Sequence, residues 1–493
     1  MKDLRAKTIR GGLAKIGSQG VNFALRLGSL MILARLLDPK DFGLVAMVTV
    51  LTGVLSLFRD FGLSTATVQR TNVTGEQLST LFWINMLVGG LLTCVALAGA
   101  APVADFYHEP RLRWITIALA GSFLFNALGV QHSALLQRQM RFTALAVIDT
   151  TSTIISVAVG IGSALYGLGY WALVGMTVVA PLVYSASVWL ASAWIPGLPH
   201  RRVGIGSMMR FGGTITLNSI VVYVAYNLEK VLLGRFWGPD ALGIYGRAYQ
   251  LVNLPTENLN AAVGEVAFSA LSRIKDDTLR LKSYFLKAYS LVVSFTLPIT
   301  IAGVLFADDL IFVVLGPKWS DAAPIFRLLA PTILVYAMIN PLWWLLASKG
   351  LVGRSLKIGL VLAPLVMASY VVGLPYGPKG VALAYSTIMT LWVIPHLAWC
   401  VHGTGVSLRD IMWTISRPLL SGIVAATLAG SAVFLLPGSF PPIGRLFLGV
   451  VVLLAAFVGM LFYVMGQKNF YLDIVRGLTT QVSHGEGSSP SVT

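Results

Sequence analysis

The chain has 493 residues, of which 56% are hydrophobic and only 11% are charged. Because soluble domains average about 45–50% apolar and about 25% charged residues, this composition excludes an ordinary soluble fold and indicates membrane-embedded helices. The formal net charge of +16 does not indicate a nucleic-acid partner, since the basic residues lie in short segments between apolar stretches, as in multi-pass membrane proteins.

Apolar segments follow one another along almost the whole chain, and about fourteen of them are long enough to span a bilayer as helices. The sequence therefore predicts an all-α polytopic membrane protein whose first partner is the lipid bilayer. The expected spans are residues 11–37, 42–61, 78–103, 112–131, 144–166, 169–194, 211–236, 240–271, 284–307, 322–348, 355–375, 379–402, 413–437 and 443–466.

The first span carries four polar residues, Lys15, Gln19, Asn22 and Arg26. At about 100° per residue they fall on one helical face, within roughly 60° of one another. Such a stripe is costly in lipid unless it meets water or a ligand. Lys15 lies near the helix start, where its ammonium could instead reach the headgroups. Arg26 lies in the middle of the span, which indicates a polar and anionic ligand.

Lysine and arginine are distributed unevenly between the connections. With a cytoplasmic N-terminus, about 23 lie on the cytoplasmic side and about 8 on the other, which predicts that both termini are cytoplasmic. No external connection exceeds about fifteen residues in this topology. Connections of this length are too short to form a folded catalytic domain outside the membrane. We therefore expect that the protein is not an enzyme.

An internal repeat divides the chain. Residues 34–44 read ARLLDPKDFGL and residues 234–244 read GRFWGPDALGI, with Arg, Pro and Gly coinciding at an offset of 200. The matched residues are Arg35, Pro39 and Gly43 in the first copy and Arg235, Pro239 and Gly243 in the second. Each copy holds six spans, which predicts parallel repeats and an alternating-access architecture with a polar site between two lobes.

The repeat sets the expected organisation of the chain. We expect an N-lobe (1–195), a cytoplasmic basic connector (196–210), a C-lobe (211–402), two appended helices (403–466) and a cytoplasmic, partly disordered tail (467–493).

Four stretches carry a family resemblance. They are LARLLDPKDFGLVAM (33–47), SLFRDFGLSTATVQR (56–70), LLQRQMRF (135–142) and NLEKVLLGRFWGPDALGIYGRAYQLVNLP (227–255). Together they resemble bacterial Wzx-type polysaccharide flippases of the WzxC kind, in the multidrug/oligosaccharidyl-lipid/polysaccharide exporter superfamily. The resemblance implies transport of undecaprenyl-pyrophosphate-linked oligosaccharide between leaflets of the bacterial inner membrane, for exopolysaccharide, capsule or O-antigen synthesis. It also implies polymerase and chain-length components as partners.

Candidate site residues follow from the polar stripe, the resemblance and the polar residues of the seventh and eighth spans. In related flippases, cations from helices 1, 2 and 8 line the cavity, and the comparable residues here would be Arg26, Arg59 and Arg247. The expected substrate-binding residues are Lys15, Gln19, Asn22, Arg26, Arg59, Lys230 and Arg247. Asp60, Glu257 and Glu265 are the carboxylates expected to couple transport to H⁺ or Na⁺. The same charges could instead pair with one another to stabilise packing. We expect no cofactor and no metal.

Three functions remain open. A cationic cavity favours a carrier of a pyrophosphate-linked lipid. A drug or cation antiporter of the same superfamily would need an acidic, aromatic cavity. A membrane-embedded polysaccharide polymerase or ligase is the rival from the enzyme class. The sequence has no G-x-x-x-x-G-K-[ST] loop, so it predicts no ATP hydrolysis by that route.

Overall fold

The computed structural model describes residues 2–59, 67, 74–200, 223–437, 440–469 and 471, without the side chains of residues 2–16, 257–262 and 265–266. Within these residues every regular element is a helix, and ten segments are long and apolar enough to cross a membrane. One of them, residues 352–401, holds two of the predicted spans. The predicted all-α, multi-pass fold is confirmed.

The chain forms two compact units. The first contains residues 1–246 and 315–319, and the second contains residues 247–314 and 320–493. The boundary falls inside a helix, whereas the sequence places the lobe boundary at 196–210. That connector lies outside the described residues from position 201 onward, so the predicted lobe limits stay a prediction.

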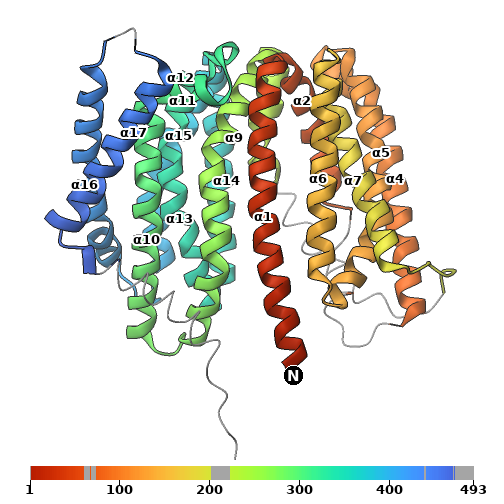
Figure 1. Cartoon of the computed structure of the whole chain (residues 1–493), viewed down its shortest axis with the longest axis horizontal. Helices are drawn as coiled ribbons and strands as arrows, with labels where there is room; N and C mark the ends of the chain where they lie inside the picture. Colours follow the sequence, from red (N-terminus) through yellow and green to blue (C-terminus); the bar gives the residue numbers. More distant parts are fainter. Residues whose placement is uncertain are drawn as a thin grey trace, which may run out of the picture. The chain divides into compact units, whose positions relative to one another are not determined.

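Among the described residues, the first unit contains six complete α-helices, the start of a seventh and the short 3₁₀ helix η1 (Pro317–Trp319). Figure 1 labels the α-helices. They are α1 (Lys2–Leu36), α2 (Pro39–Ser56), α4 (Gly75–Tyr107), α5 (Arg111–Arg138), α6 (Phe142–Leu165), α7 (Trp171–Ser192) and the beginning of α9 (Leu228–Arg273). Helix α9 is broken at Gly238, whose φ of 80° is a conformation that favours glycine, directly before Pro239. The break separates the predicted spans 211–236 and 240–271.

Small residues bring the helices of the first unit close together. Helices α4 and α5 pack along their length, with Ala96 and Ala120 fully buried between them. A Cβ added at Gly89 on α4 would lie 2.5 Å from the Cβ of Ala127 on α5. Close approach at small residues is how membrane helices gain packing energy, because lipid provides no hydrophobic driving force between them.

The second unit contains the remaining helices. They are α10 (Thr278–Leu305), α11 (Ala307–Val314), α12 (Ala322–Leu329), α13 (Pro331–Ser348), α14 (Val352–Gly373), the 3₁₀ turn η2 (Leu374–Tyr376), α15 (Gly377–Val401), α16 (Leu408–Phe434), α17 (Pro442–Gly459) and the π turn η3 (Met460–Val464). The predicted span 322–348 is confirmed as one membrane-crossing segment, Ala322–Ser348, which is built from the two consecutive helices α12 and α13. The second helix begins at Pro331, whose missing N–H suits a first turn.

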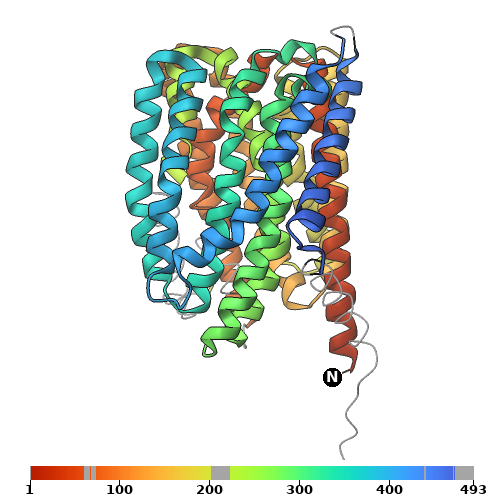
Figure 2. The same cartoon turned by 90° about the vertical axis from the view of Figure 1, so that its left-hand side faces the viewer.

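Large apolar side chains join α10, α16 and α17. Leu297, Phe306, Leu453 and Phe457 are at most 5% exposed in one cluster, to which α16 adds alanines. Figure 2 shows α16 and α17, in blue, side by side. These are the two helices that the sequence predicts as an addition to the repeat.

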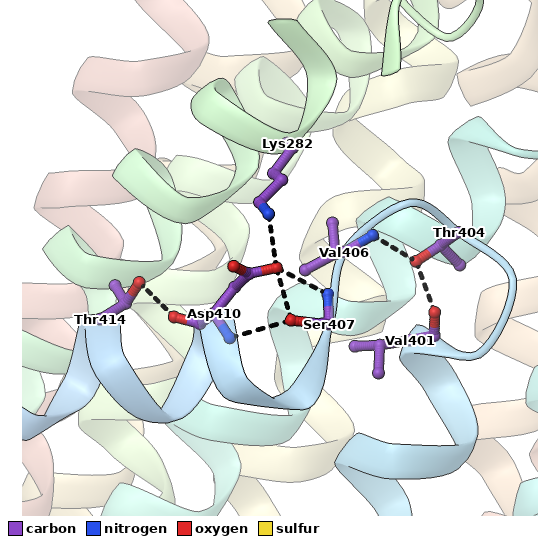
Figure 3. A network of polar contacts seen from close by, with 7 residues as sticks. All are labelled: Lys282, Val401, Thr404, Val406, Ser407, Asp410 and Thr414. Atoms are coloured by element: carbon purple, nitrogen blue, oxygen red, sulfur yellow. Dashed lines mark hydrogen bonds and ion pairs between the residues drawn. The ribbon is translucent and has the colours of Figure 1, made fainter. Parts of the chain in front are cut away.

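The start of α16 is tied to the start of α10 by a polar network (Figure 3). Lys282 of α10 lies 2.7 Å from a carboxylate oxygen of Asp410. The same carboxylate accepts the backbone N–H of Ser407 at 2.8 Å, and the Ser407 hydroxyl accepts the backbone N–H of Asp410 at 3.2 Å. This reciprocal cap satisfies donors that the helix start would otherwise leave unpaired.

Candidate functional site

The polar stripe of α1 is divided between covered and uncovered positions. Gln19 and Arg26 are exposed, whereas Asn22 is only 6% exposed and its amide donates to Asp149 of α6 at 2.6 Å. Lys15 lies on α1, but its side chain is outside the described part. The structure thus uses Asn22 to join α1 to α6, and the binding role expected for the stripe stays a prediction.

Among the described residues, Arg113 in the first turn of α5 is an exposed arginine whose guanidinium has no hydrogen bond or ion pair. Arg26 shares this property and lies in the interior of α1, away from the helix ends. Its guanidinium has no hydrogen bond or ion pair among the described residues. Arg59, after α2, donates instead to the side-chain oxygen of Asn126 at 3.0 Å, and Arg141 donates to the carbonyl of Ala191 at 2.7 Å. Arg26 therefore keeps all its donors available.

The first segment of α9 holds a carboxylate that the sequence interpretation missed. Lys230, a predicted binding residue, donates to the side-chain oxygen of Asn227 at 2.6 Å. Its neighbour Glu229 is 0% exposed, and neither carboxyl oxygen has a hydrogen-bond partner among the described residues. Glu229 and Lys230 are consecutive in the sequence, so they can be taken for an ion pair, and for this reason Glu229 was not selected as a candidate.

The side chains of the three predicted coupling carboxylates lie outside the described part of the chain. Asp60 lies outside the described residues, and so do the side chains of Glu257 and Glu265 on α9. Their role stays a prediction.

In the second unit, Arg247 begins the part of α9 that belongs there, and its guanidinium donates to the side-chain oxygen of Gln250. Close to the same segment, aromatic rings surround Tyr385 of α15. The Tyr249 ring lies 6.2 Å away edge-on, and the Tyr370 ring stacks at 5.4 Å. Tyr336 shares a hydrogen bond with the Tyr385 hydroxyl. The segment after Arg247 thus faces a polar aromatic cluster.

The two copies of the repeated turn meet each other within the first unit. A Cβ at Gly43 would run into the carbonyl oxygen of Pro239, and a Cβ at Gly243 would run into that of Pro39. We call this reciprocal contact of Pro39, Gly43, Pro239 and Gly243 the glycine–proline contact. Reciprocity of this kind is the signature of two-fold related segments, so Pro39 and Pro239 lie together as the repeat requires.

A short segment of the later chain, residues 315–319, packs beside the same turn. The indole N–H of Trp319, which is fully buried, donates to the carbonyl of Ala34 at 2.7 Å, and its ring meets Phe42 edge-on at 5.4 Å. Lys318 lies 2.8 Å from a carboxylate oxygen of Asp38. The sequence interpretation assigned these residues only to a connection.

Charged residues at a helix end of the first unit are paired. Arg111, at the start of α5, binds both carboxylate oxygens of Glu109, at 2.7 and 2.8 Å. These hydrogen bonds hold the pKa of the Glu109 carboxyl below its ordinary value. No group of three or more metal-ligating side chains occurs in the described part of the chain.

Comparison with known proteins decides the family. A family model described as a polysaccharide biosynthesis protein matches residues 32–324, more than half of the chain. The chain belongs to the polysaccharide biosynthesis protein family. The matched region begins in α1 and ends in α12, so it contains the glycine–proline contact, Glu229 and Arg247.

Several individual proteins are similar to this chain over more than half of its length. The lipopolysaccharide biosynthesis protein WzxC of Escherichia coli is 28% identical over 79% of this chain and 80% of its own length. The teichuronic acid biosynthesis protein TuaB of Bacillus subtilis is 31% identical over 59% of this chain and 61% of its own. The succinoglycan biosynthesis transport protein ExoT of Rhizobium meliloti is 23% identical over 66% of each chain.

Two solved structures share the fold. The lipid II flippase MurJ, in an inward closed conformation, matches with a TM-score of 0.72 at 13% identity, over 93% of this chain and 99% of its own. An inward-facing MATE multidrug transporter matches with a TM-score of 0.62 at 12% identity, over 78% of this chain and 94% of its own. At these identities the likeness shows the fold alone.

Proposed function

We propose that this protein is a flippase that moves lipid-linked oligosaccharide units across a membrane. Three observations support the proposal: the family, the transport role in the name of the relative ExoT, and the fold shared with a lipid II flippase. The substrate, as the sequence resemblance implies, is an undecaprenyl-pyrophosphate-linked oligosaccharide.

The observation that carries the proposal is Arg26. It is exposed on a helix of a membrane protein and has no partner among the described residues. A guanidinium in that position is costly unless it meets water, headgroups or an anion. A pyrophosphate carries about two negative charges, and its oxygens match the planar fork of arginine. We propose Arg26 as a ligand of the pyrophosphate and Arg247 as a second one.

The direction of transport belongs to the same proposal. The lysine and arginine bias favours cytoplasmic termini. The sequence resemblance implies movement of the substrate from the cytoplasmic to the periplasmic leaflet of the bacterial inner membrane. The two-fold relation within the repeated turn supports alternating access. A polymerase and chain-length components would consume the product on the far side.

A vesicle assay tests this function. Purified protein is placed in vesicles with a labelled undecaprenyl-pyrophosphate oligosaccharide, and an impermeant glycosidase reports how much substrate lies in the outer leaflet. We expect the protein to make the whole pool accessible while the mass of the lipid-linked oligosaccharide stays unchanged. A longer or transferred glycan would identify a polymerase or ligase. Transport of a cationic dye without lipid flipping would identify a drug antiporter.

A further inference from the structure

Glu229 is the most deeply buried acidic side chain in the described part of the chain. It lies in the first turn of α9 and is 0% exposed. The next most buried acid among the described residues, Asp309 at 8%, accepts a hydrogen bond from Arg445 at 2.7 Å. Glu229 accepts none: its own backbone N–H and that of Lys230 lie near the carboxyl, but not in hydrogen-bonding geometry.

The titratable groups around Glu229 are occupied elsewhere. Among the described residues, the ammonium of Lys230 and the hydroxyl of Tyr223 are close enough to act on the carboxyl electrostatically. Lys230 donates to Asn227 at 2.6 Å, and the Tyr223 hydroxyl donates to the carbonyl of Val50 at 3.2 Å. Neither group donates a hydrogen bond to the Glu229 carboxyl in this structure.

An ionised carboxylate without donors is strongly disfavoured in a dry site, and the group takes up a proton instead. We propose that Glu229 is a proton-binding site. Its carboxyl carries a proton, taken from water, while the start of α9 is packed as in this structure, and it releases that proton when the packing opens.

The packing around Glu229 links its protonation to the contact between α9 and α2. Tyr223 contacts α2 at Gly53, and Gly234 fits against Met47 of α2 and Tyr107 of α4, where an added Cβ would lie 3.2 and 2.9 Å from their side chains. One turn later comes the break at Gly238 and the glycine–proline contact. Ionising Glu229 would oppose closure of the seam between α9 and α2. Proton binding and closure of that seam therefore favour each other reciprocally.

Thermal unfolding of the purified full-length protein as a function of pH tests the site without any substrate. The wild type should lose melting temperature from mildly acidic to mildly alkaline pH, because the buried carboxyl has to ionise in place. Glu229→Gln should lack this pH-dependent loss. The matched control is Glu76→Gln, since Glu76 is an exposed acid in the first turn of α4 and its replacement should keep the wild-type profile.

A second variant covers the case in which the buried amide of Glu229→Gln prevents folding. Glu229→Leu removes the polar group at similar volume and should melt higher than the wild type at alkaline pH. Parallel pH profiles for the wild type and either Glu229 variant would overturn the proposal. It would also be overturned if Na⁺ at constant pH raised the melting temperature of the wild type but not of Glu229→Leu, because the site would then take sodium.

The link to transport rests on the proposed function and is tested separately. In the vesicle assay, a pH gradient should change the flipping rate of the wild type and leave that of Glu229→Gln unchanged. If the wild type flips no lipid-linked oligosaccharide, the proposed function fails while the unfolding result still decides the proton site. Flipping by Glu229→Gln with the wild-type response to the gradient would overturn the coupling.

Discussion

The first unit and the second unit of this protein differ in how their own helices are packed. In the first unit, the turn between α1 and α2 meets the break of α9 backbone against backbone, at Gly43 and Gly243. The side chains of Arg26 and Glu229 have no hydrogen bond or ion pair among the described residues. In the second unit, α16 and α17 are joined to their neighbours by bulky apolar side chains and by ion pairs at helix ends, such as that of Lys282 with Asp410. We propose that the unpaired side chains of the first unit bind substrate or a proton, whereas we expect α16 and α17 to have a structural role.

The largest expected effect comes from Arg26. We predict that Arg26→Ala abolishes export at a normal protein level, because losing a charge-assisted partner of the pyrophosphate in a desolvated site costs about 2–5 kcal/mol. Arg26→Lys should restore export only in part, since an ammonium does not reproduce the bidentate fork. Polymer export and membrane protein level are measured together in cells.

Arg113→Ala is the matched control for Arg26, because Arg113 is an exposed arginine in the first turn of α5. Its removal should leave export unchanged. Normal export by a well-expressed Arg26→Ala, Arg247→Ala double variant would end the phosphate-binding hypothesis. A reduced level of Arg26→Ala protein would show instead that the arginine serves folding.

The glycine–proline contact should give the next largest effect. Gly43→Ala places a methyl group against the carbonyl of Pro239, and Gly243→Ala does the same against Pro39. Neither backbone can move away without disturbing its helix start, so each variant should lose at least about 1–3 kcal/mol of stability. Lower melting temperatures, of similar size for both variants, are the expected measurement.

Gly90→Ala on α4 is the control for these two variants, since nothing lies within 4 Å of a Cβ added there. It should be neutral or slightly stabilising, because alanine favours a helix over glycine by about 0.5–1 kcal/mol. If Gly43→Ala melted like Gly90→Ala, the close contact of the two repeat copies would be disproved.

The same two regions show what the sequence could predict. Hydropathy locates most of the spans, although the predicted spans 11–37, 211–236 and 240–271 are not among the ten membrane-crossing segments found in the described residues. The matching Arg-Pro-Gly residues identify the turns that meet in the first unit, because proline and glycine are favoured at helix ends. The pair of Asn22 with Asp149, 127 positions apart, could not be predicted, since nothing local couples them. Trp319 was missed for the same reason: its partner Ala34 is an ordinary backbone carbonyl.

The smallest effect is expected where α16 meets α10. Lys282 and Asp410 are 35% and 23% exposed, so solvent screens their attraction, and pairs of this kind contribute about 0–1 kcal/mol. Ser407→Ala should cost about 1 kcal/mol, because it removes the cap of α16. Lys282→Ala should therefore lower the melting temperature no more than Ser407→Ala, and both should export polymer normally. A loss of export in Lys282→Ala at an unchanged melting temperature would contradict a purely structural role for this contact. The start of α16 would then take part in transport.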